Sequence, residues 1–93
     1  MSKTFTAQNP ATGQAVGAEI AEWDLVQTSA AIKAAESVKA KLASTNPTQR
    51  AALLNAIADA IEADKEKLAD TAHLETALPM PRLTGEVMRT VIQ

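Results

Sequence analysis

The sequence predicts an α-rich α+β segment, in which an N-terminal β-hairpin is followed by three or four amphipathic helices. Two observations predict this class. Residues 9–13 read NPATG between two short stretches with a strand-like pattern, and from about residue 24 onward apolar residues recur at helical spacing. Alanine supplies 20 of the 93 residues, which favours helix but buries little apolar surface.

The expected hairpin comprises residues 5–8, a turn at residues 9–13 and residues 14–18. Asn9-Pro10 is typical of the start of a turn, and Gly13 can adopt a positive φ at little cost. Because an isolated two-stranded ribbon is only marginally stable in water, we expect it to lie against another part of the protein.

The first expected helix covers about residues 24–43. Its thin apolar stripe is formed by Ala31, Ala35, Val38 and Leu42. Small side chains let another element approach closely, but such a stripe stabilises a helix little unless it is packed.

The clearest helix start is at Asn46. Asn46 can cap the helix, Pro47 suits the first helical position and Gln49 completes a capping box. Asp64 can cap a continuation to Thr76, which leaves open two abutting helices or one bent helix. The apolar face consists of Leu53, Leu54, Ile57, Ile61, Leu68 and Leu74.

The last expected helix opens near Pro81, because Leu78-Pro79 stops the preceding one. Arg82 and Glu86 can pair across one helical turn, and Arg89 also lies outside the apolar stripe. The stripe is formed by Met80, Leu83, Val87 and Val91.

The sequence stops at Val91-Ile92-Gln93 without a capping Gly or Asn. We therefore expect a truncation inside a helix of a longer protein. A natural, frayed end is the alternative.

Composition and charge exclude several classes of protein. The net charge of −2 is spread over interspersed residues, so no basic stripe for nucleic acid is present. The absence of cysteine excludes disulfides, thiolate metal sites and a thiol nucleophile within these residues. No apolar run approaches the ~20 residues that span a bilayer and no signal peptide is recognisable, so we expect a soluble, cytoplasmic protein.

These residues do not assemble into a complete catalytic site. His73 is the only histidine, which favours a solvent- or partner-contacting role over a proton carrier or zinc ligand. Gly13, Gly17 and Gly85 form no phosphate-binding loop. Trp23 is interpreted as a hydrophobic anchor in preference to a ligand platform. A charged solvent face, not an acid–base pair, is predicted for Asp59, Glu62, Glu66 and Asp70.

Several motifs, in this order, resemble the N-terminal part of the aldehyde dehydrogenase superfamily. They are the NPATG turn, the Pro-x-x-Arg helix start within residues 46–54, residues 57–62, residues 73–76 and a Pro-bounded helix containing Gly85-Glu86. Residues 75–86 are most similar to the branch that oxidises 2-oxoglutarate semialdehyde (2,5-dioxopentanoate) to 2-oxoglutarate with NAD(P)+.

Two positions depart from the family pattern. Ala21 stands where many members have a Ser or Thr cap three residues before the helix-opening Asp24, which weakens that helix start. Residues 77–79 read Ala-Leu-Pro where many members have Gly-Lys-Pro, and this difference points to the semialdehyde branch.

The resemblance implies that residues 1–93 are the N-terminal part of a nucleotide-binding domain and not a complete domain. Residues 1–22 would be the hairpin and the loop after it, and residues 23–93 the helical segment. The family's catalytic Cys, its Glu and its cofactor-binding residues come later in the chain, so no catalytic, cofactor-binding or metal-binding residue is assigned. Some members hold a monovalent cation at positions that correspond to Gln8 and Glu75.

We therefore expect an inactive segment of an NAD(P)-dependent aldehyde dehydrogenase. Its partner would be the remainder of the same polypeptide, which would bind NAD or NADP and the aldehyde in a homo-oligomeric parent enzyme. The alternative is a stand-alone small helical interaction module, including a homodimer that buries the same apolar stripes.

Overall fold

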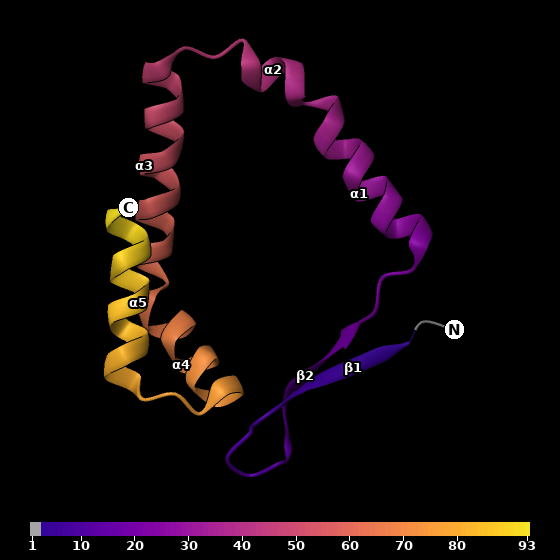
Figure 1. Ribbon diagram of the computed structural model, residues 1–93, viewed down its shortest axis with the longest axis vertical. Helices are drawn as coiled ribbons and strands as arrows, with labels where there is room; N and C mark the ends of the chain where they lie inside the picture. The colour runs from indigo at the N-terminus through magenta and orange to yellow at the C-terminus, as the bar shows by residue number, and fades with distance from the viewer. Residues whose placement is uncertain (1–2) are drawn as a thin grey trace.

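The computed structural model describes residues 3–93 and confirms the predicted class, a β-hairpin followed by helices (Figure 1). Val38 separates the first expected helix into two, and of the two alternatives after Asn46 the structure has abutting helices that meet at Asp64. The elements are β1 (Thr4–Gln8), β2 (Ala15–Ala21), α1 (Leu25–Ser37), α2 (Lys39–Ala43), α3 (Pro47–Ala63), α4 (Lys65–Thr76) and α5 (Met80–Ile92).

Asn9 organises the turn of the hairpin through four hydrogen bonds, the longest of which runs from the Thr12 N–H to the Asn9 carbonyl at 3.3 Å. Its side-chain Oδ1 accepts from the Ala11 N–H at 2.9 Å, and its carbonyl accepts from the Gly13 N–H at 2.7 Å. Its own N–H donates to the Gln14 carbonyl at 2.9 Å. Gly13 has φ 72°, as the turn chemistry predicted, because a glycine enters this region without a Cβ clash.

The hairpin carries a bulge that the sequence pattern did not reveal. Phe5 pairs with Ile20 and Ala7 with Val16, so three residues of β2 face a single residue of β1 between these pairs. Gly17 lies in this stretch with φ 78°, a conformation that suits glycine in a bulge. The bulge lets β2 continue to Ala21, three residues beyond the expected end.

Capping boxes satisfy the free backbone N–H groups at the starts of two helices. The Asn46 side chain accepts from the Gln49 N–H at 2.8 Å, and Gln49 Oε1 accepts from the Asn46 N–H at 2.9 Å, which is the predicted capping box. Asp24 and Gln27 form the same arrangement at α1. Asp24 therefore caps α1 directly, and the helix starts well although Ala21 offers no cap.

The corner between α4 and α5 contains a strained residue. Ala77 has φ 59° and is the single non-glycine residue with positive φ among residues 3–93. Its N–H donates to the His73 carbonyl at 2.9 Å, which closes the last turn of α4. A left-handed conformation brings Cβ close to the neighbouring carbonyl and costs roughly 1–2 kcal/mol in residues other than glycine.

The described part of the chain has almost no core. Within residues 3–93, Ala69 and Leu83 are the buried apolar residues, at 1% and 8% exposure. They lie where α5 packs on α4, and α5 also contacts α3. A smaller contact between β1 and α4 closes the chain into a ring.

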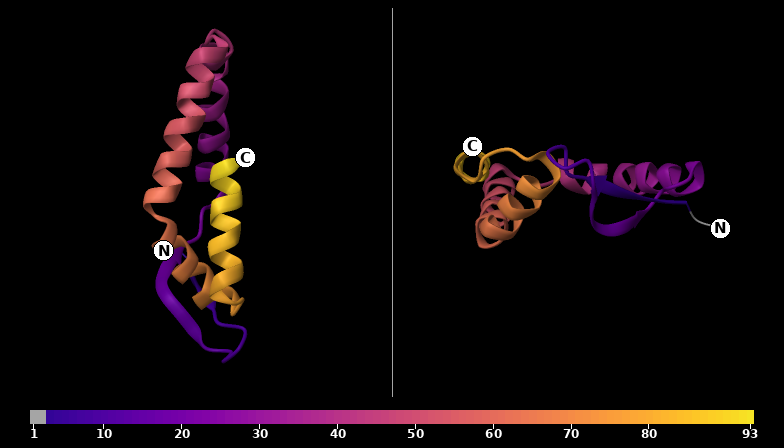
Figure 2. Two further views of the ribbon diagram at one scale, coloured as in Figure 1. Left: turned by 90° about the vertical axis from the view of Figure 1, so that its left-hand side faces the viewer. Right: turned by 90° about the horizontal axis from the view of Figure 1, so that it is seen from below.

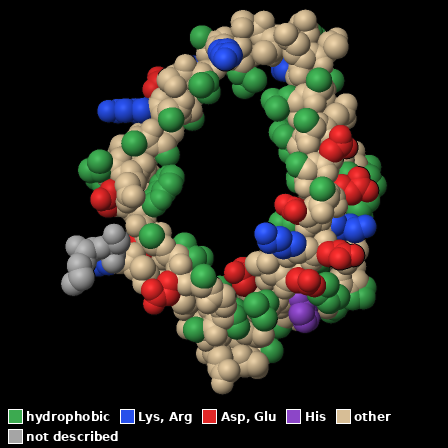
Figure 3. All heavy atoms as spheres, turned by 180° about the vertical axis from the view of Figure 1, so that it is seen from behind, with side chains coloured by type: hydrophobic (Ala, Val, Ile, Leu, Met, Phe, Trp, Pro, Cys, Tyr) green, Lys and Arg blue, Asp and Glu red, His purple; other side chains and the backbone are tan. Residues whose placement is uncertain are grey.

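The ring is a single layer. Its extents are 49 × 39 × 15 Å, and the side views show the elements spread in one sheet-like layer (Figure 2). The space-filling view shows an opening through the middle of the molecule (Figure 3). The radius of gyration is 17.5 Å, whereas a compact domain of this length has about 12 Å. Domains consist of at least two packed layers, so the fold lacks a second one.

We predict that Asn46→Ala destabilises the start of α3 by about 1 kcal/mol, because both bonds of the capping box are lost. Amide hydrogen exchange in the first turn of α3 would then be about fivefold faster. Asn55→Ala is the matched control, since Asn55 is exposed within α3 and Ala favours helix there. Equal effects of the two substitutions would contradict the capping role.

We predict that Ala77→Gly stabilises the C-terminal end of α4 by about 1 kcal/mol, because glycine removes the Cβ strain at positive φ. Amides of the last turn of α4 would exchange about fivefold more slowly. Ala60→Gly, at an exposed position inside α3, is expected to destabilise its helix instead, so that amides of α3 exchange faster. Faster exchange in the Ala77→Gly chain would show that the left-handed conformation is not a source of strain.

Candidate functional site

The most conspicuous feature of the chain is its exposed apolar surface. Leu25, Val26 and Ile92 are the most exposed large apolar residues, with 81%, 76% and 80% of their surfaces accessible. Many of the apolar positions that the sequence assigned to helix stripes are also exposed, namely Val38, Leu42, Leu53, Leu54, Ile57, Leu68 and Leu74. Each of the five helices thus exposes large apolar side chains, and apolar surface of this extent is usually covered in a folded protein.

Part of this surface is hollowed into two grooves along α5, which we call the α5 trough. Ile61 and Thr90 border both grooves. The first has a volume of about 410 Å³ and lies between α4 and α5; its other lining residues are Leu68, Ala69, Ala72, Leu83, Glu86 and Val87. The second, of about 350 Å³, lies between α3 and α5; its apolar lining is Ala51, Leu54, Ile57, Ala58, Val91 and Ile92.

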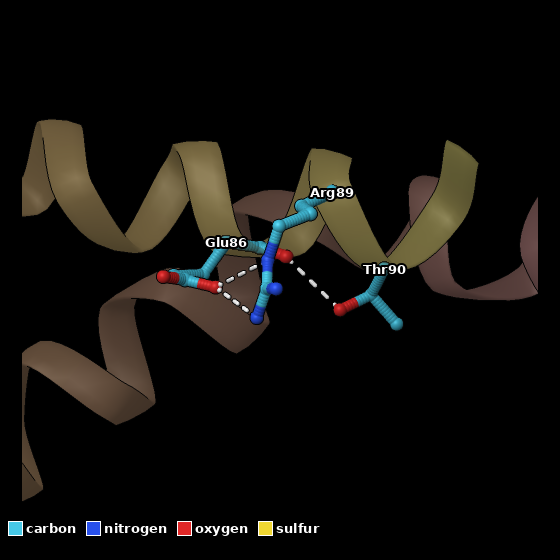
Figure 4. Close-up of polar contacts among 3 residues, drawn as sticks. All are labelled: Glu86, Arg89 and Thr90. Carbon is cyan, nitrogen blue, oxygen red and sulfur yellow. Dashed lines mark hydrogen bonds and ion pairs between the residues drawn. The ribbon is translucent and has the colours of Figure 1, made fainter. Parts of the chain in front are cut away.

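An ion pair lies on α5 at the rim of the trough (Figure 4). Glu86 Oε2 accepts from Arg89 Nε at 3.0 Å and lies 2.9 Å from Arg89 Nη2. The Glu86 carbonyl accepts from the Thr90 hydroxyl at 2.9 Å. The expected pairing of Glu86 with Arg82 is therefore wrong, because Arg89 three residues later takes that carboxylate. Both side chains are about half exposed or more, so the pair contributes little to stability.

His73 ties together the corner between α4 and α5. Its Nδ1 lies 2.6 Å from the Leu78 carbonyl oxygen, and because a carbonyl only accepts, Nδ1 carries the proton. The Thr76 hydroxyl donates to the Ala72 carbonyl at 2.6 Å and accepts from the Leu78 N–H at 3.2 Å. His73 thus contacts the chain's own backbone, a role that the sequence pattern did not indicate.

Arg50 also contacts the backbone of a corner, the one between α2 and α3. Its guanidinium donates to the Thr45 carbonyl, one residue before the helix cap Asn46. This contact gives the Pro-x-x-Arg pattern at Pro47 a physical role, since an arginine at that spacing reaches back over the first turn. His73 therefore helps to fix the angle between α4 and α5, and Arg50 helps to fix the angle between α2 and α3.

The carboxylates singled out in the sequence do not converge on an enclosed site. Glu62, Glu66 and Asp70 line an open depression of about 540 Å³ at the junction of α3 and α4, together with Lys65 and Lys67. All three carboxylates are exposed, which fits a solvated face. Asp59 lies outside this depression. No cluster of three or more His, Cys, Asp or Glu suited to a metal occurs within residues 3–93.

The structure also places Gln8, Glu75 and Trp23, three positions that the sequence analysis singled out. Gln8 ends β1 and Glu75 lies in α4, and these two elements contact each other. Trp23 precedes α1 and is 63% exposed, so the described residues do not pack around it as a hydrophobic anchor would require, and that interpretation stays a prediction. None of the helices in the described range has the length and apolarity needed to cross a bilayer.

The fold and its surface define an α-rich layer with an uncovered apolar face, and comparison with known proteins identifies its family. Residues 1–93 match the family model described as "Aldehyde dehydrogenase family". The chain belongs to the aldehyde dehydrogenase family, as the order of its motifs predicted. Over 44 residues it is 57% identical to alpha-ketoglutaric semialdehyde dehydrogenase 2 of Azospirillum brasilense. That match covers 47% of this chain and 8% of the relative, so the chain spans a small part of the relative's length.

We predict that His73→Leu loosens the corner between α4 and α5 by about 0.5–1 kcal/mol, because the bond to the Leu78 carbonyl is lost. Amide exchange in the first turn of α5 would be roughly two- to fivefold faster. His73→Asn keeps an N–H close to the Nδ1 position and is expected to retain most of the protection. If both substitutions behave alike, the contact does not fix the corner.

Proposed function

We propose that residues 1–93 are the N-terminal structural segment of the nucleotide-binding domain of an NAD(P)-dependent aldehyde dehydrogenase. The observation that carries this proposal is the missing second layer. The chain exposes 7611 Å², whereas a compact protein of its mass exposes about 5,200 Å². The remaining ~2,400 Å² is surface that a complete domain would bury.

The size of this excess favours a continuous domain over a separate module. A protein–protein interface of ordinary size buries about 800 Å² on each partner, so one such contact would leave most of the excess exposed. A parallel sheet with helices on its faces supplies a covering layer of the required extent. A small homodimer would also have to fill the opening of the ring from both copies at once.

We further propose that the whole enzyme oxidises 2-oxoglutarate semialdehyde to 2-oxoglutarate. Support comes from residues 75–86, from Ala77-Leu78-Pro79 in place of the common Gly-Lys-Pro, and from the semialdehyde that the name of the Azospirillum relative gives as its substrate. The oxidation transfers a hydride to NAD(P)+ and adds the oxygen of water to the carbonyl carbon. Residues 3–93 contribute rigidity and position to the domain that holds the cofactor.

The test measures NAD(P)H formation at 340 nm with the full-length polypeptide and with residues 1–93 alone. The full-length enzyme is expected to oxidise 2-oxoglutarate semialdehyde with a kcat/KM at least about tenfold above that for glutarate semialdehyde, which lacks only the 2-oxo group. The isolated chain is expected to form no NAD(P)H.

Two outcomes would contradict the proposed function. Aldehyde-dependent NAD(P)H formation by residues 1–93 alone would mean that the segment is itself an enzyme. A sharp thermal transition with a single defined oligomer, measured by circular dichroism and gel filtration of the isolated chain, would favour the homodimeric helical module.

A further inference from the structure

The polar side-chain contacts of the segment are all local, whereas packing of α5 on α3 and α4 and the β1–α4 contact join parts distant in sequence. Within residues 3–93, each side-chain hydrogen bond joins residues no more than five positions apart, and the ion pair on α5 spans three. Helix caps and corner contacts are therefore complete before any other part of a domain is present. What the segment lacks is apolar cover, which is non-directional and does not require a peptide bond to the covering surface.

The α5 trough is a part of the uncovered surface that is hollowed and mainly apolar. It adjoins the two buried residues Ala69 and Leu83, so its floor is fixed by existing packing. Val87 lines the trough and is partly buried. Thr84, one turn earlier on the same helix, is exposed and lines neither groove. The Glu86–Arg89 pair remains at the solvated rim, which leaves the trough floor apolar.

We propose that residues 3–93 dock onto the rest of the dehydrogenase through the α5 trough as a preformed unit, and that they do so even when supplied as a separate chain. This inference rests on the proposed function. The occupant is an apolar helix or sheet face of the remaining polypeptide. The excess of ~2,400 Å² belongs to the whole segment, of which the trough is one part, and it is about three times what each partner buries in a stable protein–protein complex. The segment as a whole therefore has enough surface to bind without covalent continuity, with the trough as the site where docking is tested.

The experiment co-expresses residues 1–93 and the remainder of the polypeptide as two chains, with an affinity tag on the remainder. The 93-residue chain is expected to co-purify in a one-to-one ratio and to restore NAD(P)H formation. Val87→Asp places a charge in the trough and is expected to lower its recovery at least about tenfold. Thr84→Asp is the matched control, because it introduces the same side chain at a β-branched position outside the trough, and its recovery should stay within about twofold of the unmodified chain.

A second measurement covers the case in which the separate remainder does not fold. In the continuous polypeptide, a thiol introduced by Val87→Cys is expected to react with a maleimide at least about tenfold more slowly under native conditions than one introduced by Thr84→Cys. Equal reactivity would overturn the docking mode.

The docking proposal also fails if the continuous enzyme is active but the soluble remainder does not bind the separate 93-residue chain. That result would leave the proposed function intact. Self-association of residues 1–93 into a defined dimer that excludes the remainder would identify a second copy as the occupant and would overturn it as well.

Discussion

Burial of apolar surface is the constraint on which the rest of this structure depends. Helix caps and turns are satisfied locally, yet most large side chains of the helix stripes remain exposed around a core of Ala69 and Leu83. A layer 15 Å thick cannot cover its own apolar face. Its helices are therefore positioned and oriented by local chemistry, while their stabilisation must come from a surface packed against them.

Local chemistry was also what the sequence predicted best. The capping box at Asn46, the positive φ at Gly13 and the stop before Pro79 each depend on residues within a few positions of one another, so they can be identified without knowing the fold. The family followed from the order of these same motifs. Helix breaks were harder to predict, because Val38 carries no signal that distinguishes it from the residues of the stripe it interrupts.

What the sequence could not predict depends on three-dimensional proximity. The α5 trough brings together residues of three helices, and its outline follows from crossing geometry that periodicity does not encode. The contact of His73 with the Leu78 carbonyl requires the chain to turn back at Ala77, whose left-handed conformation is unusual for alanine. The bulge opposite Thr6 arises from a register shift, for which Gly17 was the one available signal.

The single-residue breaks at Val38 and Asp64 have a consequence for how this segment can vary. Because neighbouring helices abut there, no loop is available to absorb a change in helix length. Adding or removing one residue inside α3 would rotate everything after it by about 100° about the helix axis and shift it by about 1.5 Å. The ring then could not close at β1, and the trough would face a different direction. Insertions should therefore be tolerated at the Asn9–Gly13 turn, which lies at the periphery, and excluded from the helices, whose lengths determine whether the ring closes.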